Sequence, residues 1–268
     1  MYRYWYRTWR DPKGTGVIVP CYDVPDNVTP MEVSGILDER ISNSSISAEI
    51  IYLATKGYIT IAQIENTALG IFTYADYQLT KLKDFTDIPN DFDKELLAGI
   101  FADAKDDVIV LSSLRNVFYR KISSVIKTIA TSLLTKGYYK NLGSMQPNII
   151  LIILVIFVAP TLFILVIGFT QAFFPSATTK LFFGIIISII IFVVMYRLSP
   201  AKTEKGVAIK EQLLGLKLYL QIAEKDRLEF HNAPEKKPEI FEKLLPFAMV
   251  LGVEKAWAKE FEGIYITP

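Results

Sequence analysis

Histidine and cysteine are almost absent from this chain, which contains one of each, His231 and Cys21. A lone cysteine excludes an intramolecular disulfide and a cysteine zinc cluster, and a lone histidine cannot form a metal-binding pair. We therefore predict no metal site and no cofactor. His231 lies in a polar segment bounded by prolines and is interpreted as a solvated loop residue, whereas Cys21 is interpreted as a packed thiol.

An excess of charge of one sign is also absent, because 29 basic residues face 28 acidic ones and the net charge is only +1. The balance is equally close within residues 1–140 and within residues 201–268. A domain that binds nucleic acid without sequence preference normally carries a basic surface. The composition therefore disfavours nucleic acid as a partner.

Side chains that could serve as nucleophile, general acid and general base do not converge on any motif. Gly14-Thr15-Gly16 lacks the Gly-Lys-Ser/Thr ending of a phosphate loop. Two acidic clusters are interpreted as a helix start and a solvated turn without calcium-site spacing, namely Asp91, Asp93 and Glu95, and Asp103, Asp106 and Asp107. We therefore predict no catalytic residues and no enzymatic activity.

Charge is missing altogether from Asn141 to Thr179, and a second apolar run extends from Leu181 to Tyr196. An uncharged apolar stretch of about 18 residues or more can cross a hydrocarbon core of about 30 Å. We predict a transmembrane hairpin in residues 147–198, with helices at about 148–171 and 180–197. The alternative for the second run is a re-entrant or interfacial segment.

Basic residues flank this region on both sides, while the connecting loop carries only Lys180. Because Lys and Arg concentrate on the cytoplasmic side, we predict a multi-pass plasma-membrane protein with both flanking domains in the cytoplasm. No ionisable residue lies inside the runs, which favours an anchor over a transport pathway. The flanking residues are Arg120, Lys121, Lys127, Lys136 and Lys140, then Arg197, Lys202, Lys205 and Lys210.

The first ten residues mix aromatic and basic side chains, a composition that favours the headgroup region of a bilayer. This pattern resembles the cytoplasmic flank of a transmembrane helix that this sequence lacks. We expect the chain to be the trailing part of a longer protein. The alternative is a surface segment that packs its aromatic rings on the leading domain.

The leading domain, residues 1–140, has the element order of a winged-helix unit. A capping box with proline at the first helical position, Thr29 to Glu32, starts one helix, and a second helix ends at Gly57. Two β-rich segments follow, at residues 58–64 and 72–79.

The signature Leu53-Ala-Thr-Lys-Gly-Tyr58 returns as Leu133-Leu-Thr-Lys-Gly-Tyr138. Between the copies we expect a helix at 91–104, a strand at 108–111 and a helix at about 117–134. The sequence therefore predicts two winged-helix-like units in tandem. Coincidence is the alternative, since a basic residue and a glycine end many helices.

The trailing domain, residues 201–268, is predicted to be helical, with one helix from Thr203 to Leu228 and two shorter ones broken near Pro246 and Gly252. Five segments from both flanking parts of the chain carry recognisable motifs: Leu244–Phe261, Gly215–Leu220, Trp9–Pro12, Pro20–Tyr22 and Ala48–Ile61. These motifs resemble those of the YciQ-like predicted membrane proteins, the family of domain of unknown function 2207. The resemblance implies a bacterial-type membrane protein and supplies no catalytic residue.

The predicted fold class is therefore an α+β membrane protein with a tandem winged-helix-like cytoplasmic domain, a two-helix transmembrane hairpin and a small helical C-terminal domain. We predict a non-enzymatic, membrane-anchored interaction or scaffold module whose partners are the lipid bilayer and a cytoplasmic or membrane protein. The alternatives are a membrane-tethered nucleic-acid-binding regulator and an accessory subunit of a transport system. The sequence does not indicate an oligomeric state.

Overall fold

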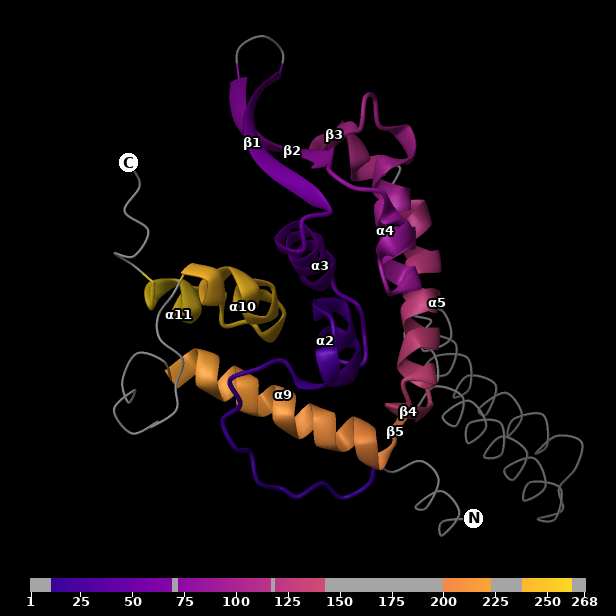
Figure 1. Ribbon diagram of the computed structural model, residues 1–268, viewed down its shortest axis with the longest axis vertical. Helices are drawn as coiled ribbons and strands as arrows, with labels where there is room; N and C mark the ends of the chain where they lie inside the picture. Colours follow the sequence, from indigo (N-terminus) through magenta and orange to yellow (C-terminus); the bar gives the residue numbers. More distant parts are fainter. Residues whose placement is uncertain (1–10, 69–71, 117–118, 143–199, 223–237, 262–268) are drawn as a thin grey trace, which may run out of the picture. The chain divides into compact units, whose positions relative to one another are not determined.

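The structure is a computed structural model that describes residues 11–68, 72–116, 119–142, 200–222 and 238–261 (Figure 1). Its first half contains helices and a hairpin in the order η1 (Pro25–Asn27), α2 (Pro30–Leu37), α3 (Asn43–Thr55), β1 (Ile59–Ala68) and β2 (Phe72–Lys81). After η2 (Phe85–Asp87) follow α4 (Asp91–Ile100), η3 (Phe101–Asp103), β3 (Val108–Val110), η4 (Leu111–Asn116), α5 (Tyr119–Thr135) and β4 (Tyr139–Asn141). The last elements described are β5 (Ala201–Lys202), α9 (Glu204–Ile222), α10 (Pro238–Leu251) and α11 (Glu254–Lys259).

The predicted capping box at the start of α2 is confirmed. The Thr29 hydroxyl accepts a hydrogen bond from the Glu32 backbone N–H, and the Glu32 carboxylate accepts one from the Thr29 backbone N–H. Proline at the first helical position gives up no hydrogen bond there, because that N–H has no partner inside the helix. Helix α2 therefore begins at the position that the capping box predicts.

The two copies of the repeated signature have the same local geometry. Helices α3 and α5 both end at a glycine in the left-handed region, Gly57 with φ 74° and Gly137 with φ 75°. In each copy the following tyrosine N–H donates to the carbonyl of a leucine five residues earlier. This is the glycine C-cap that the sequence predicts, and a strand follows it each time.

Strands β1, β2 and β3 form a three-stranded antiparallel sheet in that order. Strand β1 pairs with β2 from Ile59 opposite Lys81 to Ala68 opposite Phe72, and β3 pairs with the other edge of β2. Ile59 and Leu79 are buried at the base of the hairpin, whereas Ile61 and Tyr77 are exposed further along it. The base of the hairpin therefore belongs to the core, whereas part of its middle is exposed.

Helix α4 packs against α5, and α2 packs against both α3 and α5. Leu96 and Leu97 of α4 and Ile129 and Leu133 of α5 are completely buried. Burial of an aliphatic side chain of this size stabilises a fold by about 1.5–3 kcal/mol. These side chains form the core of the leading helices.

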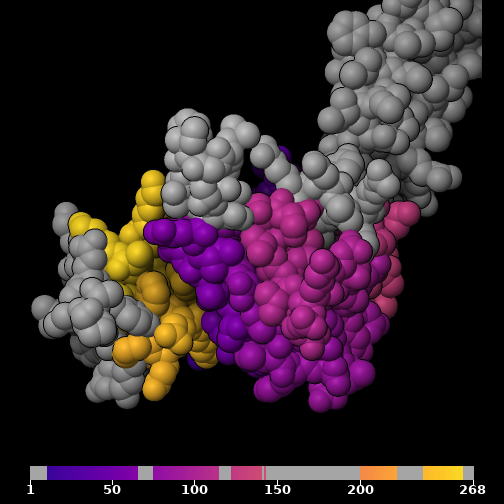
Figure 2. All heavy atoms as spheres, turned by 90° about the horizontal axis from the view of Figure 1, so that it is seen from above, coloured from indigo at the N-terminus to yellow at the C-terminus, as the bar shows by residue number. Residues whose placement is uncertain are grey.

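The trailing helices pack on the leading ones. Helix α10 packs on α2 and α3, and α9 contacts α2 and η1. Figure 2 shows the gold C-terminal helices directly against the violet leading residues. The chain divides into one unit of Lys13–Tyr138 with Glu204–Pro268, and another of Met1–Pro12 with Tyr139–Thr203. In this division Glu204–Pro268 fall in the same unit as Lys13–Tyr138, and the domain boundaries predicted from the sequence stay a prediction.

In the second unit the described residues form a short antiparallel pair, β4 with β5. The Lys202 side chain is completely buried there, 3.8 Å from the Asp11 carboxylate and 5.0 Å from the Tyr139 ring centroid. The Asp11 carboxylate also accepts a hydrogen bond from the Lys202 backbone N–H.

One helix break predicted in the trailing segment is wrong. Pro246 lies inside α10, which continues to Leu251, and the chain breaks only at Gly252 with φ 69°. Proline removes one hydrogen bond and normally kinks or ends a helix. Here Pro246 is buried in α10 beside Phe247 and Ala248, and the packing of this face on α2 and α3 maintains the helix.

The predicted fold class needs correction. In the described ranges the protein is an α+β fold, and no helix there combines the length and the apolar character needed to cross a membrane. The two helices predicted at 148–171 and 180–197 lie outside the described residues. The prediction rested on the length of two apolar runs, and no element within the described ranges corresponds to a transmembrane hairpin.

Candidate functional site

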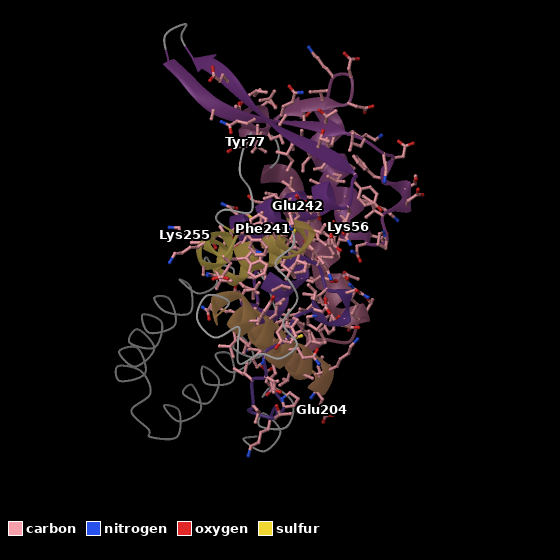
Figure 3. The ribbon with its side chains drawn as sticks, turned by 60° about the vertical axis from the view of Figure 1, so that its left-hand side comes forward. Lys56, Tyr77, Glu204, Phe241, Glu242 and Lys255 are labelled. Carbon is pink, nitrogen blue, oxygen red and sulfur yellow. The ribbon has the colours of Figure 1, made fainter. Side chains whose placement is uncertain are left out.

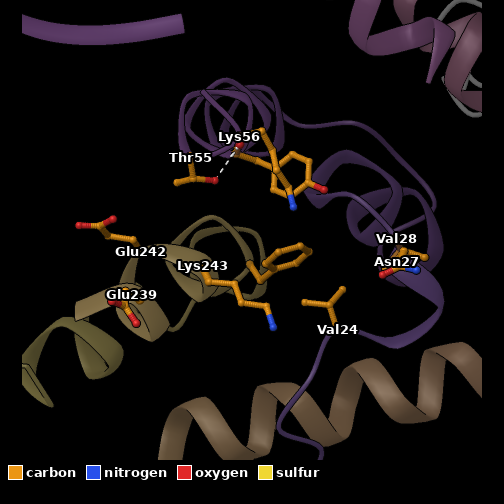
Figure 4. Close-up of a pocket in the computed structure, with 10 residues that line it drawn as sticks. Val24, Asn27, Val28, Thr55, Lys56, Glu239, Glu242 and Lys243 are labelled. Atoms are coloured by element: carbon orange, nitrogen blue, oxygen red, sulfur yellow. Dashed lines mark hydrogen bonds between the residues drawn. The ribbon is translucent and has the colours of Figure 1, made fainter. Parts of the chain in front are cut away.

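A cavity of about 240 Å³ opens between the C-terminal end of α3, helix α10 and the segment that precedes α2 (Figure 4). We call it the α3–α10 pocket. All of its walls belong to the unit formed by Lys13–Tyr138 and Glu204–Pro268. Its lining residues are Val24, Asn27, Val28, Tyr52, Thr55, Lys56, Glu239, Glu242, Lys243 and Phe247.

The floor of the pocket is apolar. Val28 and Phe247 are buried, with 1% and 3% of their surface exposed. The Phe247 ring meets the Tyr52 ring edge to face, with centroids 5.9 Å apart. An edge-to-face pair adds about 0.5–1.5 kcal/mol to the free energy of area burial. These two rings therefore hold α3 and α10 at a fixed distance and shape the cavity.

Two lysine side chains, those of Lys56 and Lys243, line the pocket beside this apolar floor. The Lys56 ammonium lies 5.2 Å from the Tyr52 ring centroid, in a cation–π contact. The Lys243 ammonium lies 3.0 Å from the Asp23 carboxylate. In Figure 4 both ammonium groups point towards the middle of the pocket, whereas Glu239 and Glu242 lie at its outer side. The charges of the pocket are thus separated, positive inside and negative outside.

The Tyr52 hydroxyl is a hydrogen-bond donor at every physiological pH. Burial, followed by the nearby Glu49 and Asp93 carboxyl groups, raises the pKa of Tyr52 to about 12. A phenol with this pKa does not ionise near neutrality, so it cannot act as a general base there. It can donate to an anion that enters the pocket.

Behind Tyr52, one turn earlier on α3, the Glu49 carboxyl group is completely buried. Its Oε2 accepts a hydrogen bond of 2.6 Å from the Met31 backbone N–H. Asp93, at the start of α4, is 1% exposed, and its Oδ2 accepts a hydrogen bond from the Asn90 amide. Burial raises the pKa of Glu49 well above its ordinary value and that of Asp93 to about 6.

The remaining oxygens of this pair, Glu49 Oε1 and Asp93 Oδ1, find no donor among the described groups when both are ionised. The Asp93 carboxyl group is close enough to raise the pKa of Glu49. Two carboxylates cannot hydrogen-bond to each other, whereas a carboxylic acid donates to a carboxylate. We therefore infer that the two acids share one proton, which satisfies both oxygens and joins α3 to α4.

A third buried carboxylate, that of Glu32, has conventional partners. Its oxygens accept hydrogen bonds from the Ser132 hydroxyl at 2.8 Å and from the Lys136 ammonium, and the shortest distance of the ion pair is 2.7 Å. Both donors lie on the last turns of α5, so this pair joins α2 to α5. Lys136 thus has a role in the fold, in addition to the place in the basic flank that the sequence indicates.

The Gly14-Thr15-Gly16 loop holds a carboxylate, although it has no phosphate-loop motif. The Thr15 hydroxyl and the backbone N–H groups of Thr15 and Gly16 all donate to Glu211 of α9. The Thr15 hydrogen bond and then that of Gly16 lower the pKa of Glu211. The loop fixes the leading segment on α9 and is a structural feature rather than a binding site.

The other residues singled out from the sequence are scattered. His231 lies outside the described residues. The Cys21 thiol is half-buried and donates to the Asp23 carbonyl at 3.0 Å. Asp91 is exposed and pairs with Lys94, while Glu95 accepts a hydrogen bond from Thr128. Among Asp91, Asp93 and Glu95, only Asp93 belongs to the buried pair of acids.

The turn with Asp106 and Asp107 has φ angles of 53° and 60° and is exposed, as predicted. In the parts of the chain that the structure describes, no three His, Cys, Asp or Glu side chains are grouped so that they could hold a metal ion. The pocket residues could not be identified from the sequence, because a lysine that follows a helix and a valine in a loop match no motif.

Comparison with known proteins gives a family and nothing closer. No curated protein and no solved structure matches the chain. No matching solved structure therefore identifies the helix–helix–hairpin unit as a winged helix. Residues 19–261 match the family model described as the C-terminal domain of predicted membrane protein DUF2207.

This match confirms the family resemblance seen in the sequence, although the narrower YciQ-like name has no support from it. It covers α2 to α11 and the whole of the α3–α10 pocket. The family description gives a membrane protein of unknown function and assigns no activity. The chain belongs to this DUF2207 family of predicted membrane proteins.

Proposed function

We propose that this membrane protein is a non-enzymatic interaction module that binds a protein partner through the α3–α10 pocket. The observation that supports the proposal is the lining of the pocket, where positively charged and neutral donors surround an apolar floor. Such a combination of a few polar groups and an apolar surface is typical of recognition sites. No hydroxyl or thiol in the lining stands beside a base that could activate it.

We also propose that the pocket faces the cytoplasm. The support comes from the sequence, in which basic residues stand on both sides of the uncharged segment 141–179. In membrane proteins, basic residues near apolar segments favour the cytoplasmic side. The single cysteine, whose thiol is hydrogen-bonded to a carbonyl, is compatible with a reducing compartment.

The partner is tested by site-specific photo-crosslinking of the full-length protein in cells. A photo-reactive residue replaces Thr55, which is exposed at the rim of the pocket, and in a control it replaces Lys94, which is partly exposed on α4. We expect a discrete protein adduct from position 55, absent from position 94 and reduced by Lys56→Glu with Lys243→Glu. Equal adducts at both positions, or none at position 55, would refute the proposal.

The side of the membrane is tested separately. In a Cys21→Ser background, Thr55→Cys supplies one exposed thiol. A membrane-impermeant maleimide should label it only after the cells are opened. Labelling in intact cells would place the pocket outside the cytoplasm.

A further inference from the structure

The α3–α10 pocket contains three hydrogen-bond donors without an acceptor. These are the Lys56 ammonium, the Tyr52 hydroxyl and the Asn27 side-chain amide. In the described part of the chain the Lys56 ammonium has only its contact with the Tyr52 ring, and neither of the other two donors meets a hydrogen-bonding partner. Donors that line one cavity without a protein acceptor favour an anionic ligand.

A fourth donor, Lys243, can leave its present ion pair at a small cost in free energy. It pairs with Asp23, but the two side chains are 63% and 81% exposed. An ion pair this exposed contributes roughly 0–1 kcal/mol. An incoming anion can therefore replace or share the Asp23 carboxylate, and its charge would then lie between Lys56 and Lys243.

The anion must also carry an apolar group. Val24, Val28 and the rings of Tyr52 and Phe247 form the rest of the inner wall. The volume of about 240 Å³ is below the roughly 300–1,000 Å³ of pockets for drug-sized ligands. The cavity thus fits one apolar side chain together with its carboxylate.

The outer rim of the pocket is negatively charged and favours a positively charged part of the ligand. Glu239 and Glu242 are exposed at the outer side of the pocket, where α10 begins. A ligand that extends past them gains from positive charge and loses from negative charge. The ligand therefore changes sign along its length, from an anion inside the pocket to a cation outside it.

We infer that the α3–α10 pocket binds the free C-terminal carboxylate of a partner protein whose last residue is apolar and whose preceding residues are basic. The carboxylate accepts from the lysines, Tyr52 and Asn27, the last side chain covers the apolar floor, and the basic residues meet the rim. This inference rests on the proposed function and specifies the partner that it requires.

The probe is a fluorescein-labelled peptide, Lys-Arg-Lys-Gly-Leu, with a free C-terminal carboxylate, titrated with the full-length protein in detergent micelles by fluorescence polarisation. Matched peptides end in a carboxamide, end in aspartate instead of leucine, or replace the basic residues by glutamate. We expect each of these changes to weaken binding at least tenfold.

Three variants test the pocket residues. Lys56→Gln and Lys243→Gln should each weaken binding of the acid peptide about tenfold and reduce the difference between acid and amide, since a hydrogen bond to a charged group is lost. Tyr52→Phe should have a smaller effect in the same direction. The control is Lys255→Gln, because Lys255 is exposed on α11, and in Figure 3 it lies on the opposite side of the view from Lys56.

The outcomes separate the two proposals. Equal affinity for acid and amide peptides, or no binding of the acid peptide while the adduct from position 55 persists, would overturn the C-terminal ligand and leave the interaction module standing. Loss of both the peptide binding and the adduct would overturn both. Acid-selective binding that depends on Lys56 and Lys243 but not on Lys255 supports the inference.

Discussion

Replacement of Glu49 by glutamine is expected to make the protein more stable at pH 8 and to reduce the dependence of its stability on pH. The Glu49 side chain shares a proton with Asp93 in a site where neither is more than 1% exposed. A glutamine amide can donate permanently to Asp93 Oδ1, and its carbonyl can still accept from the Met31 N–H. The substitution keeps both hydrogen bonds and removes the need for a proton.

The magnitude follows from the difference between folded and unfolded pKa values. The pKa of Asp93 is 3.8 in the unfolded reference and about 6 in the folded protein, and one unit corresponds to about 1.36 kcal/mol. The folded state holds this proton more tightly, so the contribution to stability is present below pH 4 and lost as the pH rises through 6. The free energy of unfolding therefore falls by about 3 kcal/mol over this pH range. The raised pKa of Glu49 extends the fall to higher pH.

The assay is urea unfolding of the full-length protein in micelles from pH 4 to pH 8, followed by tryptophan fluorescence, since Trp257 is buried. Wild-type stability should fall with pH, while Asp93→Asn should equal it at pH 4 and exceed it by about 3 kcal/mol at pH 8, because its carbonyl can still accept from Asn90. Glu49→Gln should change stability in the same direction, since it removes the raised pKa of Glu49.

The double substitution is the sharper test. With both amides present, the Glu49→Gln and Asp93→Asn side chains turn donors towards each other, and one buried donor is left without an acceptor at a cost of about 1–3 kcal/mol. We expect the double variant to be less stable at pH 8 than either single variant. Additive stabilisation by the two substitutions, or a wild type whose stability is flat between pH 4 and pH 8, would refute the shared proton.

Three further predictions use the same protein. Lys136→Met leaves Glu32 buried without its counter-ion and should lower stability by about 3 kcal/mol, whereas Lys94→Met, at an exposed pair, should cost under about 0.5 kcal/mol by the urea midpoint. Gly215→Ala should destabilise α9 by about 1–3 kcal/mol despite better helix propensity, because the Val19 carbonyl oxygen occupies the place of the new Cβ. In a gel shift at low salt, duplex DNA should remain unbound, and a salt-sensitive shift would contradict the interaction module.

Local signals predicted the local structure. The capping box fixed the start of α2, and Gly57 and Gly137 fixed the ends of α3 and α5, because each of these signals depends on a few neighbouring residues. The β-branched content of residues 58–64 and 72–79 indicated the two strands that form the hairpin. Such features are set within one turn or one strand, so a single sequence contains the information.

Packing between distant segments was not predictable in this way. Asp91 and Asp93 stand two residues apart at the same helix start, and the sequence gives no reason to separate them. In the structure Asp91 is exposed beside Lys94, whereas Asp93 turns inward to Glu49 of α3. The difference depends on how α4 rests on the leading helices, which no local pattern encodes.

Helix α3 carries residues of both the α3–α10 pocket and the buried acid pair, so it connects these two sites physically. Tyr52 follows Glu49 by three residues and Lys56 follows Tyr52 by four, so the three lie on adjacent turns of one helix face. The charge state of Glu49 and Asp93 raises the pKa of Tyr52, whose ring contacts both Lys56 and Phe247. Because the shared proton ties α3 to α4, the position of the pocket wall depends on a hydrogen bond in the core. A surface that recognises a partner is therefore built on a buried acid pair, and a substitution at Glu49 acts on the pocket without touching its lining.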